Sequence, residues 1–307
     1  MKYRRLGKTG LRVSVVGVGT WQFGGEWGKA FTQDEVERLL ARARELGMNL
    51  IDSAECYGDH LSEKLIGRAI RGDRGSWIIA TKFGHHFHGN FERTPHYSAP
   101  EVREQLEASL RALGTDYVDL YQFHSGSNEA FDQPDLWEML REQVKLGKVR
   151  HIGLSVSPND NIHQVSKASE VGIRTVQVVY NRLDRQPEEA VLSACLSQDV
   201  GVLARVPLAS GLLTGKYRPG AEFTSPDDVR SLRDKAEVQE RLELVQRIAR
   251  AEVPRGVPMA TWALAWCLQN PAVTCVIPGS KTIEQLDLNA NAADLDMVSR
   301  EHRQAVD

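Results

Sequence analysis

The feature that most constrains this chain is a regular alternation of short apolar runs with longer amphipathic runs, from about residue 15 to residue 290. Strand-length runs are expected at 15–19, 48–53, 77–82, 117–124, 149–156, 174–180, 201–209 and 274–279, each followed by a segment of helical periodicity. Alternating strands and helices require parallel strands joined by right-handed crossovers. Eight such units without a linker-like break predict a closed (β/α)8 TIM barrel, formed as a single domain over residues 1–307 and preceded by an N-terminal β-hairpin that turns at residues 8–10.

Two segments begin like nucleotide-binding fingerprints but do not complete them. The stretch "GVGTWQ" starts as G-x-G-x-x-G and then has Gln22 in the place of the third glycine. The stretch "GKT" at residues 7–9 lacks the upstream glycine of a P-loop, and no strand precedes it. The sequence therefore favours the barrel over a doubly wound sheet.

Composition and charge exclude several classes of function. A hydrophobic content of 41% and a charged content of 26% are typical of a globular protein, and a net charge of −3 gives no basis for nucleic-acid binding. No apolar run approaches the ~20 residues of a membrane helix, and no apolar segment follows the basic start as in a secretory signal. The cysteines have no metal or redox spacing, which predicts reduced thiols in a cytoplasmic protein: Cys56, Cys195, Cys267 and Cys275.

Polar side chains follow three consecutive predicted strands at the point where each strand ends. Asp52 ends the second strand and Tyr57 lies on the loop behind it, while Lys82 ends the third strand and His124 the fourth. Each residue alone has an ordinary structural role, such as a helix cap, a solvated lysine or a buried imidazole. Because the chemistry of such barrels lies at the carboxyl ends of the strands, the four are expected to meet at one mouth.

The four residue types together are suited to protonating a carbonyl oxygen. A phenol has a pKa near ~10, and a nearby ammonium favours the phenolate, so Lys82 is expected to lower the pKa of Tyr57. Asp52 supplies the counter-charge that a buried lysine needs, and the imidazole of His124 can polarise the carbonyl from the other side. No side chain supplies a hydride, so the combination implies a reduced nicotinamide.

These segments, taken in order, resemble the aldo-keto reductase superfamily from the N-terminal hairpin to about Asn289. The resemblance rests on "NLIDSAECYG", "ATKFG", "DLYQFH" and "GKVRHIGLS", which together are highly specific. It implies an NAD(P)H-dependent enzyme that reduces an aldehyde or ketone to the alcohol. By the resemblance, Tyr57 is the general acid, Lys82 and Asp52 tune it, and His124 orients the carbonyl of a small-molecule substrate.

The resemblance also implies which residues hold the cofactor. Gly19, Thr20, Trp21 and Asp52 belong to the nicotinamide end, Ser155 and Gln177 to the carboxamide, and Arg205 takes the place of an aromatic residue that stacks on the ring. The pyrophosphate is assigned to Val206, Pro207, Leu208, Ser210, Gly211 and Lys216, and the adenosine to Gly279, Ser280, Lys281, Gln285 and Asn289. Because Ser280 and Lys281 can bind a 2′-phosphate, NADPH is favoured over NADH.

The loop after the third strand predicts the surroundings of the substrate. It contains His85, His86, His88 and His96, but no carboxylate or cysteine completes a convincing ligand set, so no metal is expected. The predicted substrate contacts are Trp21, Tyr57, Phe83 and His124.

Two other classes of function stay open at this point. One is a nicotinamide-binding regulatory subunit without catalysis, and the other is a metal-assisted hydrolase or isomerase that uses Asp52, Glu55 and His124. The oligomeric state and the identity of the carbonyl substrate do not follow from the sequence.

Overall fold

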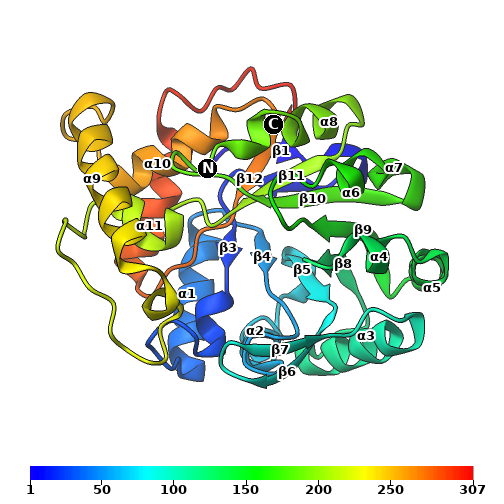
Figure 1. Ribbon diagram of the computed structural model, residues 1–307. Coiled ribbons are helices and arrows are strands. Elements are labelled where there is room, and N and C mark those ends of the chain that lie inside the picture. The colour runs from blue at the N-terminus through cyan, green and yellow to red at the C-terminus, as the bar shows by residue number, and fades with distance from the viewer. Residues whose placement is uncertain (307) are drawn as a thin grey trace.

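A computed structural model describes residues 1–306 and contains the parallel barrel that the sequence predicts. Within these residues one eight-stranded sheet has the order β12-β11-β10-β9-β8-β5-β4-β3, and its ladders are parallel (Figure 1). The strands are β3 (Val18–Gly19), β4 (Leu50–Asp52), β5 (Ile78–Phe83), β8 (Val118–His124), β9 (Val149–Ser155), β10 (Ile173–Val179), β11 (Gly201–Arg205) and β12 (Val273–Val276). Parallel bridges from Val16 to Val276 and from Gly19 to Gly279 join the two edges and close the barrel.

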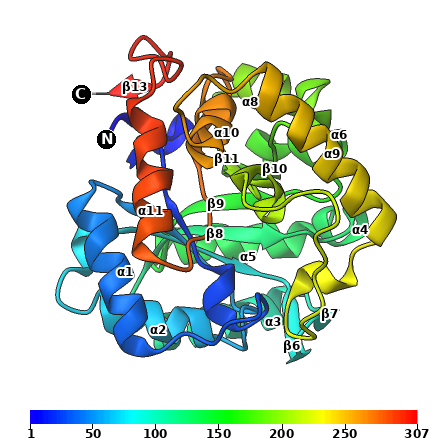
Figure 2. The same ribbon diagram turned by 90° about the vertical axis from the view of Figure 1, so that its left-hand side faces the viewer.

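The helices lie outside the strands, as Figures 1 and 2 show from two directions. They are α1 (Gln33–Glu45), α2 (Leu61–Ala69), α3 (Ala99–Leu113), α4 (Asn128–Phe131), α5 (Pro134–Lys145), α6 (Ile162–Ser166), α7 (Ala168–Val171), α8 (Val191–Ser197), α9 (Lys235–Ala251), α10 (Met259–Leu268) and α11 (Ile283–Ala290). The helix starts follow the sequence signals: Thr32 and Glu35 form a capping box at α1, and Ser98 and Glu101 form another at α3. None of the helices in residues 1–306 has both the length and the apolar character needed to cross a membrane.

The predicted N-terminal hairpin is formed by β1 (Tyr3–Arg5) and β2 (Arg12–Ser14), and a short strand near the other terminus joins it. Strand β13 (Ala305–Val306) pairs antiparallel with β1, which brings the two ends of the chain together. Leu6 and Val13 of the hairpin region pack with Leu50, Leu120 and other residues inside the barrel. The hairpin therefore covers the end of the barrel at which the strands begin, so that access is left at the carboxyl ends.

A second hairpin follows β5, where the sequence predicted a loop. Strands β6 (His85–Gly89) and β7 (Glu92–Pro95) pair antiparallel and lie beside the mouth of the barrel (Figure 2). Arg93 of β7 forms an ion pair with the buried carboxylate of Glu26 at 2.5 Å, and the backbone N–H of Phe91 donates to the same carboxylate at 2.9 Å. This contact fixes the hairpin against the loop that follows β3.

Side chains alternate between the barrel interior and the layer under the helices along each strand. In β4, Leu50 belongs to the interior cluster, Ile51 to the cluster between sheet and helices, and Asp52 points inward again. In β5, Ala80 and Lys82 are the inward pair in the same way. The period of two therefore brings the last inward residue of each of these strands to the open end of the barrel.

Candidate active site

A cavity of about 610 Å³ opens at the carboxyl ends of the strands. This volume lies within the range of about 300–1,000 Å³ that is usual for small-molecule sites. Among the predicted site residues, its lining includes Gly19, Thr20, Trp21, Asp52, Tyr57, His124, Gln177, Arg205, Val206, Pro207, Leu208, Ser210, Gly211, Lys216, Gly279, Lys281, Gln285 and Asn289. Residues from the whole length of the chain thus meet in one place.

Asp52 and Lys82 form a buried ion pair beneath the cavity. The Lys82 side chain is fully buried, and its Nζ donates to Asp52 Oδ2 at 2.8 Å, to the Ser53 carbonyl at 2.6 Å and to the Tyr57 hydroxyl at 3.2 Å. An ammonium has three N–H donors, so all of them are used. Burial lowers the pKa of Lys82, but the charge of Asp52 and the Tyr57 hydroxyl more than offset that effect and raise it. Lys82 therefore remains a cation.

Two glutamines hold the other oxygen of Asp52. Gln177 Nε2 donates to Asp52 Oδ1 at 2.7 Å, and Gln122 Nε2 donates to the same atom at 3.1 Å. Gln122 was not among the predicted site residues. The period of two along β8 would have identified it, because Gln122 lies two positions before His124 and points to the same side. Asp52 is thus fixed from three strands at once.

Close contact between two backbone loops positions Tyr57. A Cβ atom on Gly24 would lie 2.6 Å from the Tyr57 carbonyl carbon, so the loop after β3 can approach only because this residue is glycine. Gly58 has a φ of +68°, and a Cβ there would lie 2.6 Å from the Gly24 carbonyl oxygen. The Tyr57 ring stacks near Trp21, with ring centroids 6.0 Å apart. The glycine after Tyr57 in the sequence motif therefore has a steric reason.

The expected lowering of the Tyr57 pKa is wrong as a net effect. Burial of the phenol raises its pKa, and although Lys82 lowers it, the result is a pKa raised to about 12. The ammonium limits the cost of burial but does not cancel it. Tyr57 is therefore a protonated donor at neutral pH, held by Lys82 and pointing into the cavity.

His124 faces Tyr57 across the mouth, with ring centroids 6.3 Å apart. Burial, with a smaller contribution from the neighbouring His85, brings its pKa well below the ordinary value, so the imidazole is neutral. A neutral imidazole keeps one N–H donor and one acceptor. A phenol held by an ammonium and a neutral imidazole opposite it can together donate hydrogen bonds to one carbonyl oxygen.

The other end of the cavity is positively charged. Lys216 and Lys281 line it, and Lys281 Nζ is held in place by the Trp27 carbonyl at 2.5 Å. In the loop after β11, Val206, Ser210 and Gly211 have positive φ values, and this loop lines the same part of the cavity. The Arg205 Nε is buried and has no hydrogen-bond partner within residues 1–306. Flat groups at one end and cations at the other fit a nicotinamide dinucleotide with its anionic pyrophosphate.

Four predicted site residues lie outside the lining of the cavity: Lys82, which lies beneath it, and Phe83, Ser155 and Ser280. Phe83 was expected to contact the substrate, but it follows the inward Lys82 by one position, so its ring points outward and packs on Tyr121 and Phe123. Ser155 is fully buried beneath Gln177, to which its hydroxyl donates at 3.5 Å. The Ser280 hydroxyl is buried and accepts a hydrogen bond from Asn289 at 2.9 Å. The period of two would have excluded Phe83.

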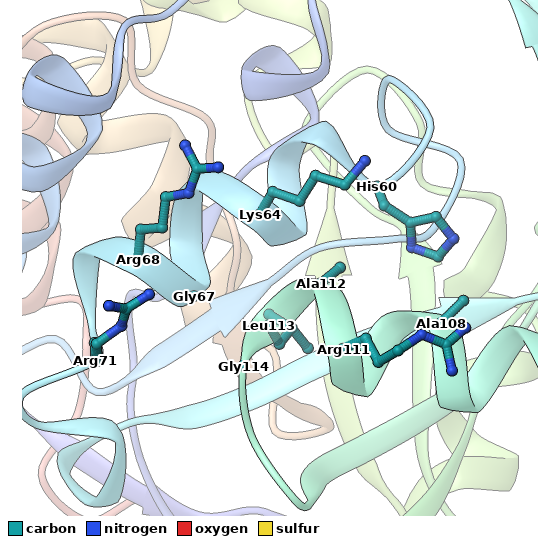
Figure 3. A pocket seen from close by; sticks show the side chains of 10 residues that line it. All are labelled: His60, Lys64, Gly67, Arg68, Arg71, Ala108, Arg111, Ala112, Leu113 and Gly114. Atoms are coloured by element: carbon teal, nitrogen blue, oxygen red, sulfur yellow. The ribbon is translucent and has the colours of Figure 1, made fainter.

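A second cavity of about 470 Å³ lies between α2 and α3, on the outside of the barrel (Figure 3). It is lined by the cationic side chains of Lys64, Arg68, Arg71 and Arg111. Lys64, Arg68 and Arg111 are exposed helix positions and Arg71 is exposed in the turn after α2, and no inward residue of the barrel strands reaches this groove. The first cavity is therefore the candidate functional site.

Comparisons with known proteins agree with this geometry. The model of the Aldo/keto reductase family matches residues 15–307. The chain is 32% identical over 295 residues to the aldo-keto reductase YhdN of Bacillus subtilis, covering 94% of this chain and 87% of the relative. It is 29% identical to the fission yeast aldo-keto reductase yakc [NADP(+)], covering 96% of this chain and 89% of the relative.

A solved structure is similar over nearly the full length. The holo form of an aldo-keto reductase from Bacillus halodurans superposes with a TM-score of 0.81 and is 30% identical, covering 99% of this chain and 94% of that chain. The similarity includes the strands that carry the cavity, and it does not depend on the terminal segments alone.

Proposed function

The chain belongs to the aldo/keto reductase family and is an NAD(P)H-dependent oxidoreductase, and from this premise we propose that it reduces an aldehyde or ketone to the alcohol with Tyr57 as the proton donor. One observation carries the proposal: the Lys82 ammonium spends its three N–H donors on Asp52, the Ser53 carbonyl and the Tyr57 hydroxyl. This arrangement holds the phenol in one place beside a neutral imidazole.

The proposed chemistry divides between the cofactor and the protein. NADPH, when bound, supplies the hydride to the carbonyl carbon. Tyr57 and His124 bind the carbonyl oxygen, and Tyr57 donates its proton to the developing alkoxide. Lys82 stabilises the negative charge that forms on the phenol oxygen, and Asp52 keeps Lys82 in position. A phenol whose pKa is raised to about 12 still gives its proton to an alkoxide, because an alkoxide is a stronger base.

We propose NADPH rather than NADH because of the charges at the far end of the cavity. Lys216 and Lys281 lie where the phosphates of the dinucleotide are expected, and Gln285 and Asn289 line the cavity beside them. The Ser280 hydroxyl accepts a hydrogen bond from Asn289 and keeps its own O–H, but Ser280 lies outside the cavity lining, so the 2′-phosphate would depend mainly on Lys281. The name of the fission yeast relative, which includes NADP(+), also supports this choice.

We further propose that residues 1–307 act as one catalytic domain in the cytoplasm. In the described part of the chain all four cysteines are free and buried, which is typical of a protein from a reducing compartment. One barrel carries every residue of the site, so no second domain is needed to complete it.

The test is NADPH consumption by the purified protein against a panel of aldehydes, ketones and sugars, with the variant Tyr57→Phe as the control. We expect turnover with at least one carbonyl and a loss of about 10²–10⁴-fold in kcat for Tyr57→Phe, with NADPH binding retained. A wild-type protein that binds NADPH and reduces no carbonyl would instead support a regulatory nicotinamide-binding subunit. Full turnover by Tyr57→Phe would overturn the assignment of the acid.

A further inference from the structure

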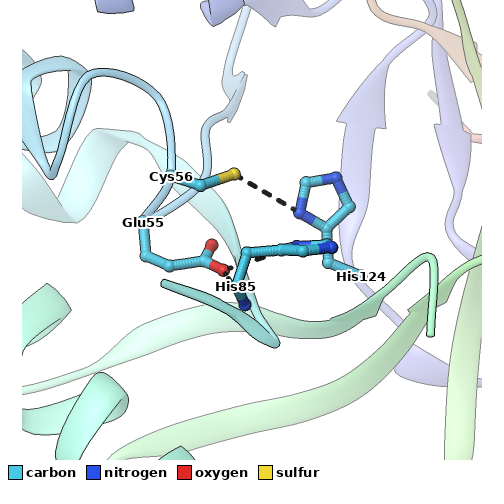
Figure 4. A group of neighbouring side chains, drawn as sticks. All are labelled: Glu55, Cys56, His85 and His124. Atoms are coloured by element: carbon cyan, nitrogen blue, oxygen red, sulfur yellow. Dashed lines mark hydrogen bonds and ion pairs between the residues drawn. The ribbon is translucent and has the colours of Figure 1, made fainter. Parts of the chain in front are cut away.

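Four potential metal ligands converge at the mouth of the barrel, beside the proton donor. They are the carboxylate of Glu55, the thiol of Cys56 and the imidazoles of His85 and His124, and one ligand atom from each lies within 4.8 Å of the others (Figure 4). Cys56 Sγ is 3.8 Å from His124 Nδ1, and Glu55 Oε1 is 3.9 Å from His85 Nδ1. The loop after β4, the start of β6 and the end of β8 contribute these residues, which are far apart in the sequence.

Two polar atoms of this group are buried and lack a partner among the residues that the structure describes. Glu55 is only 3% exposed, and its Oε2 accepts no hydrogen bond; the Nδ1 of His85 is likewise unpaired. Buried polar groups without a partner lower the stability of the folded protein. These two atoms lie beside a thiol and a second imidazole and have no partner in the described chain, so they are free to bind an external ion.

We propose that Glu55, Cys56, His85 and His124 bind a divalent transition-metal ion such as Zn²⁺. The bound ion blocks carbonyl reduction because it coordinates His124, which then cannot bind the carbonyl oxygen of the substrate. A thiolate, two imidazoles and a carboxylate are the donors that Zn²⁺ and Co²⁺ prefer, whereas Mg²⁺ and Ca²⁺ prefer oxygen alone. Tetrahedral zinc with bonds of about 2.0–2.3 Å places its ligand atoms roughly 3.3–3.8 Å apart. The cluster needs only a small contraction to reach that geometry.

Binding requires an ordinary proton exchange and no redox step. The Cys56 thiol releases its proton to solvent as the S–metal bond forms, and each imidazole binds through its unprotonated nitrogen. Since Cys56, His85 and His124 all line the cavity, an ion can reach them from the solvent side. Asp52 takes no part, because Lys82, Gln122 and Gln177 already bind its two oxygens.

The barrel assembles a ligand set that the local sequence lacks. The four histidines of residues 85–96 have no cysteine among them, and the nearest thiol in the chain is Cys56. A rival site exists on the hairpin itself, where the centroid of the His86 ring lies 5.0 Å from that of His88 and 5.5 Å from that of His96. His86 is exposed and lies outside the four-residue cluster, so it offers a matched control.

The first experiment measures metal binding and does not depend on the proposed function. Protein stripped of metal with EDTA is titrated with Co²⁺ and with Zn²⁺. Binding is measured by calorimetry and, for Co²⁺, by the charge-transfer absorption of a thiolate bound to the ion. We expect one ion per chain with that absorption, an affinity at least tenfold lower in Cys56→Ser with the band absent, and no change in His86→Gln. Circular dichroism confirms that both variants are folded. Equal Co²⁺ affinity in Cys56→Ser, or loss of binding in His86→Gln, would overturn the site.

The second experiment measures inhibition and rests on the proposed function. With NADPH and an active carbonyl substrate, Zn²⁺ is expected to inhibit competitively against the carbonyl, and EDTA is expected to restore the rate. Inhibition should be at least tenfold weaker in Cys56→Ser, each variant being compared with its own metal-free rate. Metal binding without inhibition would overturn the blocking of His124, whereas failure of the proposed function would appear as absent turnover with metal binding intact.

Discussion

Two buried carboxylates three residues apart, Asp52 at the end of β4 and Glu55 on the loop that follows, have very different surroundings. Asp52 and Glu55 are each only 3% exposed. Asp52 binds a lysine through one oxygen and two glutamines through the other. Glu55 accepts one hydrogen bond, from the backbone N–H of His85 at 3.0 Å, and its second oxygen has no partner within residues 1–306. Burial raises the pKa of Glu55 to about 7.

The difference separates a fixed part of the site from an incomplete one. A buried charge with a full set of partners is held in one place, and breaking such a pair costs far more than a surface ion pair. A buried carboxylate with an unpaired oxygen has lost its hydration without gaining a partner, and protonation or a bound cation can reduce that free-energy cost. The end of β4 and the loop after it therefore hold the anchor of the proton donor and two of the proposed metal ligands, Glu55 and Cys56.

The largest expected effect comes from removing the lysine partner of Asp52. Lys82→Met leaves Asp52 buried without its cation and Tyr57 without its hydrogen-bond donor. We expect a loss of about 3–5 kcal/mol in the free energy of unfolding and a loss of at least about 100-fold in kcat. Chemical denaturation and NADPH consumption measure the two effects, with the exposed Lys64→Met as the matched control. A variant as stable and as active as Lys64→Met would show that the pair is dispensable.

The second prediction concerns Glu55, whose effect on the free energy of unfolding depends on pH. The pKa of Glu55 is raised by burial to about 7, from an ordinary value of 4.5. The folded protein therefore binds this proton more tightly than the unfolded chain, and stability is lost as pH rises from 4.5 through 7. In Glu55→Gln, measured in EDTA, the free energy of unfolding should exceed that of the wild type by about 1–3 kcal/mol at pH 8, with most of the gain gone at pH 5.

Glu63→Gln is a suitable contrast for that measurement, because Glu63 is equally buried but has partners on both oxygens, His60 and Thr81. Its substitution should lower stability rather than raise it. If Glu55→Gln is also destabilising at pH 8, the second oxygen of Glu55 has a partner in solution and the comparison fails.

The smallest expected effect comes from removing one of the two glutamine hydrogen bonds to Asp52. Gln122→Met removes the donor to Asp52 Oδ1 but leaves Gln177 and Lys82 in place. We expect a cost of about 1–3 kcal/mol in the free energy of unfolding, smaller than that of Lys82→Met. Urea denaturation of the two variants and the wild type ranks them. A cost equal to that of Lys82→Met would mean that the glutamine, and not the lysine, is the main partner of Asp52.

Much of the fold follows from the sequence because its signals are local. The period of two in the strands is set by neighbouring residues, and the structure confirms the barrel. The capping boxes at Thr32 and Ser98 are local in the same way, because each joins residues three positions apart. The β6–β7 hairpin was not predicted, since its histidine-rich strands are short and depend on the ion pair of Arg93 with Glu26. Strand β13 was also missed, because only its pairing with β1 defines it.

What the sequence by itself determined is the set of chemical groups at the ends of the strands and the side to which each points. Asp52, Lys82 and His124 could be named because strand ends and a repeat of two residues are visible in a linear chain. Only the tertiary structure decided which of these groups have partners, since barrel closure brings Glu55 to His85 and Gln177 to Asp52. It also decided the direction of the Tyr57 pKa shift, because the cost of burying a phenol depends on everything around it and here outweighs the effect of the Lys82 ammonium.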